Sequence, residues 1–152
     1  MTLHETLRNH TFTRGLTGEH IDKLASLATE VTFAEDQVIL ANRQRSQFFY
    51  LVASGSVNIE LRTPTFTASV VAVGPDEVFG WSALLDDQDT LFQARAREHT
   101  VALRIGGADL IEACRSDGKL GVEILLRTLR VVAGRVQATE AKFAEMCGVR
   151  PG

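Results

Sequence analysis

The residues best suited to chemistry lie in one short segment, GPDEVFGWSALLDD, which runs from Gly74 to Asp87. Its Gly-Pro-Asp start predicts a turn, and the stretch after it predicts the beginning of a short helix. Backbone N–H groups at the start of a helix bind anions, and a glycine lets a ligand approach the backbone closely. The segment therefore predicts an anion-binding site formed by Phe79, Gly80, Trp81, Ser82 and Ala83.

Two side chains of this segment have alternative interpretations. Trp81 either stacks on a ligand or fills the cavity itself, and we favour filling because large aromatic side chains pack interiors well. Ser82 either donates a hydrogen bond to an anion or caps the short helix, and capping is the favoured role.

The other reactive side chains form no catalytic or metal-binding pattern. The four histidines lack ligand spacing, and the first two lie near a chain end that we expect to be mobile: His4, His10, His20 and His99. There is no His-x-His cluster of the kind a cupin enzyme needs. The acids of the loop after the segment lack the glycine and glutamate of a calcium loop: Asp86, Asp87 and Asp89. Cys114 and Cys147 stand alone, which indicates reduced thiols. We expect no enzyme, no metal and no cofactor.

Short β-rich runs separated by turns fill the middle of the chain. A helix capped by Thr17 comes first, with an apolar stripe at Ile21, Leu24, Leu27 and Ala28. Strand-like runs follow, and the Ser54-Gly55 break between two of them predicts a hairpin turn. Strands at such close spacing favour a small sandwich or barrel. Helical periodicity returns at Ala108–Arg115.

The last element is a long helix, which we expect over Lys119–Cys147 with Gly148 as its stop. Its apolar positions alternate in spacing between three and four residues, as in a coiled coil. At 1.5 Å per residue the helix is about 40 Å long, too long to be buried on one small barrel. We therefore predict a homodimer through a seam formed by Val122, Leu125, Leu129, Val132, Val136, Thr139, Phe143 and Met146.

Three segments in this order resemble the cyclic nucleotide-binding domain of the catabolite activator protein (Crp/Fnr) superfamily. They are FYLVASGSVNIEL (Phe49–Leu61), GPDEVFGWSALLDD and GRVQATEAKF (Gly134–Phe143). The resemblance implies a mostly β fold, a double-stranded β-helix or jelly roll with flanking helices. It implies a ligand-binding-like domain over residues 1–117, a dimer helix over 118–148 and a phosphate-binding cassette at Gly74–Asp87. Thr139 matches a threonine that contacts the base in the activator, although a polar seam residue also sets register; both roles stay open.

The cassette departs from the pattern of the family's nucleotide-binding members. Trp81 stands where a glutamate binds the ribose, and Thr90 stands where an arginine binds the phosphate. The nearest downstream cation, Arg95, belongs to a later strand position. The variant is similar to stand-alone domains with Trp-Ser-Ala at the cassette, so we predict a degenerate cassette whose candidate residues also include Thr90 and Thr139.

Composition limits the remaining classes of function. Net charge is −3 and no basic run appears, so we expect no nucleic-acid partner and no DNA-binding domain. No apolar run is long enough for a membrane span, and no secretory signal is present, so we expect a cytoplasmic protein. Three functions remain: a dimeric sensor of a small anionic ligand that signals to an unknown protein partner, a true cyclic nucleotide receptor with an unusual site, and a ligand-free interaction module.

Overall fold

A computed structural model of the chain describes residues 1–85 and 92–148. The described residues form two four-stranded antiparallel sheets, with strand orders β1-β8-β3-β6 and β2-β7-β4-β5. The strands are β1 (Ala28–Phe33), β2 (Val38–Leu40), β3 (Phe48–Ser54), β4 (Val57–Arg62), β5 (Thr67–Val73), β6 (Val78–Phe79), β7 (Phe92–Ala96) and β8 (Thr100–Gly106). The helices are α1 (Leu3–Asn9), α2 (Gly18–Leu27), the 3-10 helix η1 (Trp81–Leu84), α3 (Gly107–Ser116) and α4 (Gly118–Met146).

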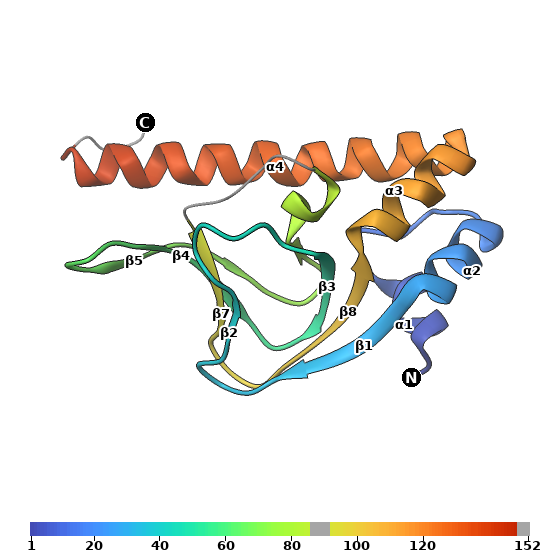
Figure 1. Ribbon diagram of the computed structural model, residues 1–152, viewed down its shortest axis with the longest axis horizontal. Helices are drawn as coiled ribbons and strands as arrows, with labels where there is room; N and C mark the ends of the chain where they lie inside the picture. The colour runs from blue at the N-terminus through green and yellow to red at the C-terminus, as the bar shows by residue number, and fades with distance from the viewer. Residues whose placement is uncertain (86–91, 149–152) are drawn as a thin grey trace.

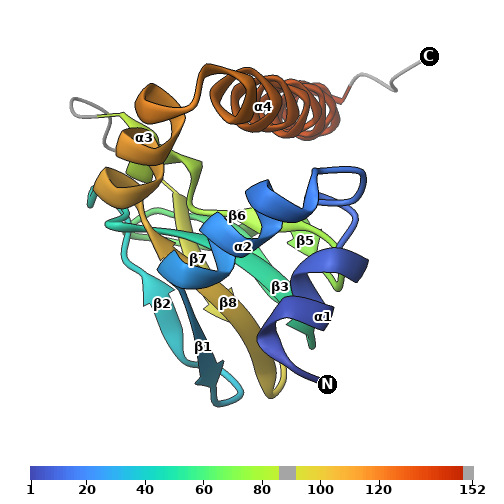
Figure 2. The same ribbon diagram turned by 90° about the vertical axis from the view of Figure 1, so that its right-hand side faces the viewer.

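The two sheets enclose one apolar cluster, and the helices cover the outer face of the β1-β8-β3-β6 sheet (Figures 1 and 2). Strand β3 is buried on both faces because successive side chains of a strand point to opposite sides of the sheet. Tyr50 and Val52 pack inside the roll, whereas Phe49 and Leu51 pack against the helices. This double burial explains the uninterrupted apolar run in the sequence and confirms the predicted jelly-roll class.

The Ser54-Gly55 turn is real, but it does not form the predicted hairpin. Gly55 has a φ of +90°, as a tight turn requires. However, β3 pairs with β6 and β8, and β4 pairs with β5 and β7. The turn is therefore a corner where the chain passes from one sheet to the other. Thr100 holds it, because its hydroxyl accepts from the Ser56 N–H at 3.1 Å.

The N-terminus begins with a helix that the hydrophobic pattern did not predict. In α1, Thr2 and Glu5 form a capping box: the Glu5 N–H donates to Thr2 Oγ1 at 3.2 Å, and the Thr2 N–H donates to Glu5 Oε2 at 2.8 Å. The Thr-x-x-Glu spacing was the available signal. The helix predicted after Thr17 is confirmed as α2 with Thr17 as its N-cap, but it ends at Leu27, and Ala28 starts β1.

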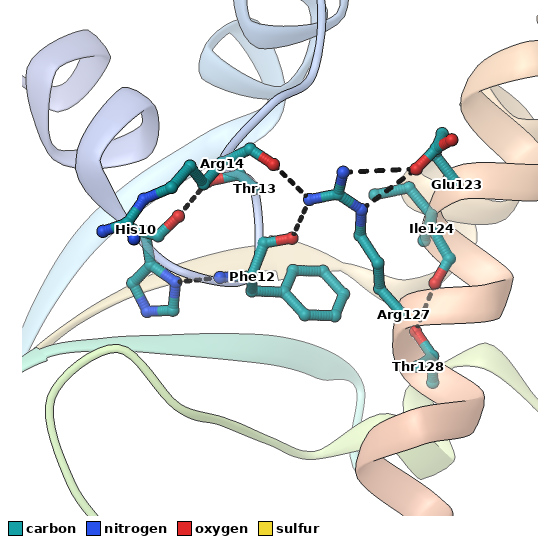
Figure 3. Close-up of polar contacts among 8 residues, drawn as sticks. All are labelled: His10, Phe12, Thr13, Arg14, Glu123, Ile124, Arg127 and Thr128. Atoms are coloured by element: carbon teal, nitrogen blue, oxygen red, sulfur yellow. Dashed lines mark hydrogen bonds and ion pairs between the residues drawn. The ribbon is translucent and has the colours of Figure 1, made fainter.

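A polar latch joins this N-terminal region to α4 (Figure 3). Arg127 donates through Nη1 to the carbonyls of Phe12 at 2.6 Å and Arg14 at 2.8 Å, and its guanidinium pairs with Glu123. His10, expected near a mobile end, is instead 2% exposed. Its Nδ1 accepts from the Phe12 N–H at 3.1 Å, and its Nε2 lies 3.0 Å from the Val52 carbonyl. These partners require a neutral ring with the proton on Nε2.

The buried His10 ring predicts a pH dependence of stability. Burial lowers the pKa of His10, although hydrogen bonding to the Val52 carbonyl and the charge of Asp76 act in the opposite direction. In the unfolded chain His10 is protonated below about pH 6.5, whereas in the folded chain it stays neutral to a lower pH. The free energy of unfolding therefore falls as the pH falls below about 6.5. The loss is at most about 1.4 kcal/mol per pH unit for one proton.

The His10→Gln variant is expected to be less stable than wild type at pH 7.5 but to lose less stability on acidification to pH 5. Urea denaturation across this range measures both effects. Parallel stability curves for the two proteins would contradict the assignment to His10.

The N-terminal part of helix α4 packs on the body of the protein, and the helix then extends away from it. Asp117 caps it by accepting from the N–H groups of Lys119 and Leu120. Gly121 packs so closely on α3 that a Cβ there would lie 2.6 Å from the Cys114 carbonyl oxygen. The C-terminal half then runs past the sheets on the side where the β4–β5 hairpin projects (Figure 1). The predicted long helix is confirmed, with its bounds one residue earlier at each end.

Candidate functional site

The predicted cassette forms a sharp turn between β6 and η1. Gly80 has a φ of +82°, and a Cβ at this position would lie 2.5 Å from the Phe48 carbonyl oxygen. Only glycine fits both restraints. Phe79 pairs with Tyr50 of β3 and stacks on its ring at a centroid distance of 4.6 Å, which fixes the start of the turn.

Ser82 does not cap the short helix, so the capping interpretation is wrong. The N-cap is Gly80, and no side chain bonds to that end of η1. Ser82 lies inside η1 and is 5% exposed. Its hydroxyl oxygen accepts from the Ser46 N–H at 3.3 Å, which ties the cassette to the segment before β3.

Trp81 forms a wall of an open cavity. It packs against the apolar cluster between the β1-β8-β3-β6 sheet and the helices. Its other side borders a cavity of about 160 Å³, here called the cassette cavity, which is lined by Leu40, Ile59, Phe79, Gly80, Trp81, Ser82, Phe92, Gln93, Ala94 and Arg135. Ala83 lies outside this lining and packs on the start of α3, where a Cβ on Gly107 would meet the Ala83 carbonyl. Thr90 and the loop acids Asp86, Asp87 and Asp89 lie outside the described residues.

Arg135 is the cavity residue that the sequence analysis missed. It reaches the cassette cavity from α4, far along the chain from the cassette. Burial lowers the pKa of Arg135, and the charge of Glu77 acts in the opposite direction. Among residues 1–85 and 92–148, its guanidinium has no hydrogen bond or ion pair. Its position one helical turn before Thr139, off the apolar seam, was the signal in the sequence.

The cation considered from the sequence, Arg95, is engaged elsewhere. Its Nη2 donates to Glu60 Oε2 at 2.7 Å across the β4–β7 pair. The hydrogen bond and charge of Glu60 raise the pKa of Arg95. Glu60 is 2% exposed and also accepts from Gln93 Nε2 at 2.8 Å. Arg95 therefore neutralises a buried carboxylate.

The seam of α4 is open to solvent in the single chain. Most of its members are at least half exposed: Val122, Leu125, Leu129, Val136, Phe143 and Met146. Thr139 and Val132 are partly buried. The Thr139 hydroxyl donates back to the Arg135 carbonyl at 2.9 Å, and Thr139 does not line the cassette cavity.

The described residues offer neither a metal site nor a membrane-spanning helix. No group of three or more His, Cys, Asp or Glu side chains there is arranged to hold a metal ion. No helix in those ranges has the length and apolar character to cross a bilayer. The Cys114 thiol is buried, and burial raises its pKa, so it is a poor nucleophile.

Comparisons with known proteins agree with this geometry. The family model "Cyclic nucleotide-binding domain" matches residues 30–117. A Geobacter metallireducens GS-15 protein described as a cyclic nucleotide-binding protein is 26% identical, with a TM-score of 0.78 and coverage of 90% of this chain and 99% of that one. No curated protein matches the chain.

Two more distant structures share the fold. The catabolite activator protein of Thermus thermophilus is 22% identical, with a TM-score of 0.72 and coverage of 90% of this chain and 63% of that one. The regulatory subunit of a cAMP-independent protein kinase A from Trypanosoma brucei, as a triple variant with cAMP bound in its A site, is 20% identical. Its TM-score is 0.76, and the match covers 93% of this chain and 50% of that one. The family match spans more than half of the sequence, and the chain therefore belongs to the cyclic nucleotide-binding domain family.

Proposed function

We propose that this protein is a regulatory module that binds a small anionic ligand in the cassette cavity, with Arg135 as the cation. The observation that carries the proposal is the partly buried Arg135 guanidinium beside the cassette, without an ion-pair partner among the described residues. A buried charge is costly unless it is compensated. An anionic ligand compensates it and gains a charge-assisted hydrogen bond.

The cassette argues against a cyclic nucleotide as that ligand. Trp81 offers only an indole N–H where the ribose hydroxyl needs an acceptor. Thr90 has no charge for the phosphate. The cAMP-bound variant of the cAMP-independent trypanosome protein includes a threonine-to-arginine change.

We further propose that the module acts as a dimer that signals through α4 to a protein partner. The exposed seam supports dimerisation, because large apolar patches are rare on monomeric proteins. The packing of η1 on α3 at Gly107, and of α3 on α4 at Gly121, supports a route from the cassette to the seam. Neither contact leaves room for even one methyl group, so we expect a displacement of η1 to be passed to α3 and α4.

Titration calorimetry with cyclic AMP and cyclic GMP, beside a thermal-shift screen of anionic metabolites, tests the proposal. We expect no tight cyclic nucleotide binding and at least one stabilising anion. A low micromolar affinity for either nucleotide would restore the orthodox receptor. If no anion binds, the ligand-free interaction module is favoured.

For an anion found in that screen, Arg135→Gln is expected to weaken binding by roughly tenfold to a hundredfold, because a charge-assisted contact is lost. Arg135→Lys should restore part of the affinity, since it keeps the charge without the planar fork. Arg115 is an exposed residue of α3 outside the cavity. Arg115→Gln therefore removes the same charge elsewhere and serves as the control. Equal affinities in Arg135→Gln and Arg115→Gln would contradict the role of Arg135.

A further inference from the structure

A larger cavity lies outside the roll, against α4. It has a volume of about 650 Å³ and is here called the α4 groove. Helix α4 forms one wall, and the N-terminal segment and the β5–β6 region form the others. Its lining residues are Thr11, Phe12, Arg14, Val71, Val73, Asp76, Glu77, Val78, Arg127, Arg130, Val131, Gly134 and Arg135. The volume is in the range of pockets that bind small organic molecules, about 300–1,000 Å³.

The lining combines apolar and cationic residues. Phe12, Val131 and the valines of β5 and β6 supply the apolar part. Two cations of the lining make no side-chain hydrogen bond or ion pair within the described ranges, Arg130 and Arg135, and of these Arg130 is the exposed one. Arg127, by contrast, is held by the latch of Figure 3.

The acidic residues of the α4 groove are occupied by backbone groups. Asp76 accepts from the Thr11 N–H at 3.2 Å, and Glu77 accepts from the Gly74 N–H at 3.0 Å. Both carboxylates therefore hold the loops that form the groove wall. The groove presents an apolar surface with a cationic edge on α4.

Gly134 is an independent sign of an occupant. It lies in the interior of α4, where glycine is less stable than alanine. A Cβ at this position would meet nothing within 4 Å, so packing inside the chain does not require glycine here. A ligand in the α4 groove can approach the helix backbone at Gly134, and a methyl group would obstruct it.

We propose that the α4 groove is a second ligand site, which binds a small amphipathic anion. The apolar body lies on Val71 and Val131, which are only partly buried, and the acidic head group pairs with Arg130. This site does not depend on the proposed cassette ligand, although Arg135 borders both cavities. Charge and shape complementarity favour this occupant over a neutral or cationic one.

Displacement of a fluorescent anion tests the proposal on the full chain. Anilinonaphthalene sulfonate is the reporter, dodecanoate the competing anion, and dodecyltrimethylammonium the cationic competitor of similar length. We expect saturable binding of the reporter and displacement by dodecanoate only. Arg130→Gln should weaken dodecanoate about tenfold, as expected for loss of one charge-assisted contact. Arg115→Gln should leave the affinity unchanged.

Gly134→Ala separates binding from folding. It should raise the melting temperature, because alanine favours the helix, and yet weaken dodecanoate. Gly118→Ala, at the other open glycine of α4, should keep wild-type affinity. Equal dodecanoate affinity in all four variants, displacement by both competitors, or binding only to a monomeric variant would overturn the proposal. The last result would mean that a second copy of the chain covers the groove.

Discussion

The double variant Trp81→Glu, Thr90→Arg is expected to bind cyclic AMP at least about a hundredfold more tightly than wild type. The glutamate supplies the acceptor for the ribose hydroxyl, and the arginine supplies a two-pronged contact to the phosphate. The turn at Gly80 that presents the backbone is already formed. Removing the indole also opens the cassette cavity, which Trp81 borders.

Titration calorimetry measures this gain, and three further variants separate its causes. Trp81→Ala removes bulk without adding an acceptor, and each single change supplies one contact only. We expect the single variants to recover less than the double variant, because a charge buried without its partners costs free energy. Wild-type binding at low micromolar concentration would show that the interpretation of Trp81 and Thr90 is wrong.

Replacing Leu129 and Val132 by glutamate is expected to convert a dimer into monomers. Leu129 is 61% exposed in the single chain and Val132 is only partly buried, so the double substitution removes limited packing within one chain. In a two-fold pairing of α4 helices, the change instead places carboxylates of both copies in one apolar seam. Moving these carboxylates out of water costs several kcal/mol per ion. We expect this cost to exceed the stabilisation from the apolar contacts that remain in the seam.

Sedimentation velocity at micromolar concentration distinguishes the two states, and circular dichroism verifies that α4 remains helical. The matched control is Gln137→Glu with Ala141→Glu, which adds the same charge at exposed α4 positions outside the seam. The control should stay dimeric. A monomeric wild type, or dissociation of the control as well, would contradict the proposed seam.

Local patterns in the sequence predicted most of the elements, although not α1. The turn at Ser54-Gly55 was predicted, although not its corner geometry, because a glycine between two strand-like runs marks a turn; Gly55 has a positive φ. The length of α4 was predicted because an apolar spacing of three and four residues is maintained between Val122 and Met146. Short strands at close spacing predicted a small sandwich or barrel, and the family resemblance implied the jelly roll. In each case the physical cause acts over a few neighbouring residues.

The tertiary structure decided which distant residues meet. The corner at Gly55 looked like a hairpin because a turn between two apolar strands says nothing about the sheet to which each strand belongs. His10 can be buried because its ring hydrogen-bonds to the Phe12 N–H and the Val52 carbonyl. The sequence around an isolated histidine does not reveal such partners. Arg135 lies beside the cassette only because the packing of α4 on the body brings it to the same cavity. Pairing and burial depend on the packing of whole layers, so the sequence determined the elements and the packing determined the site.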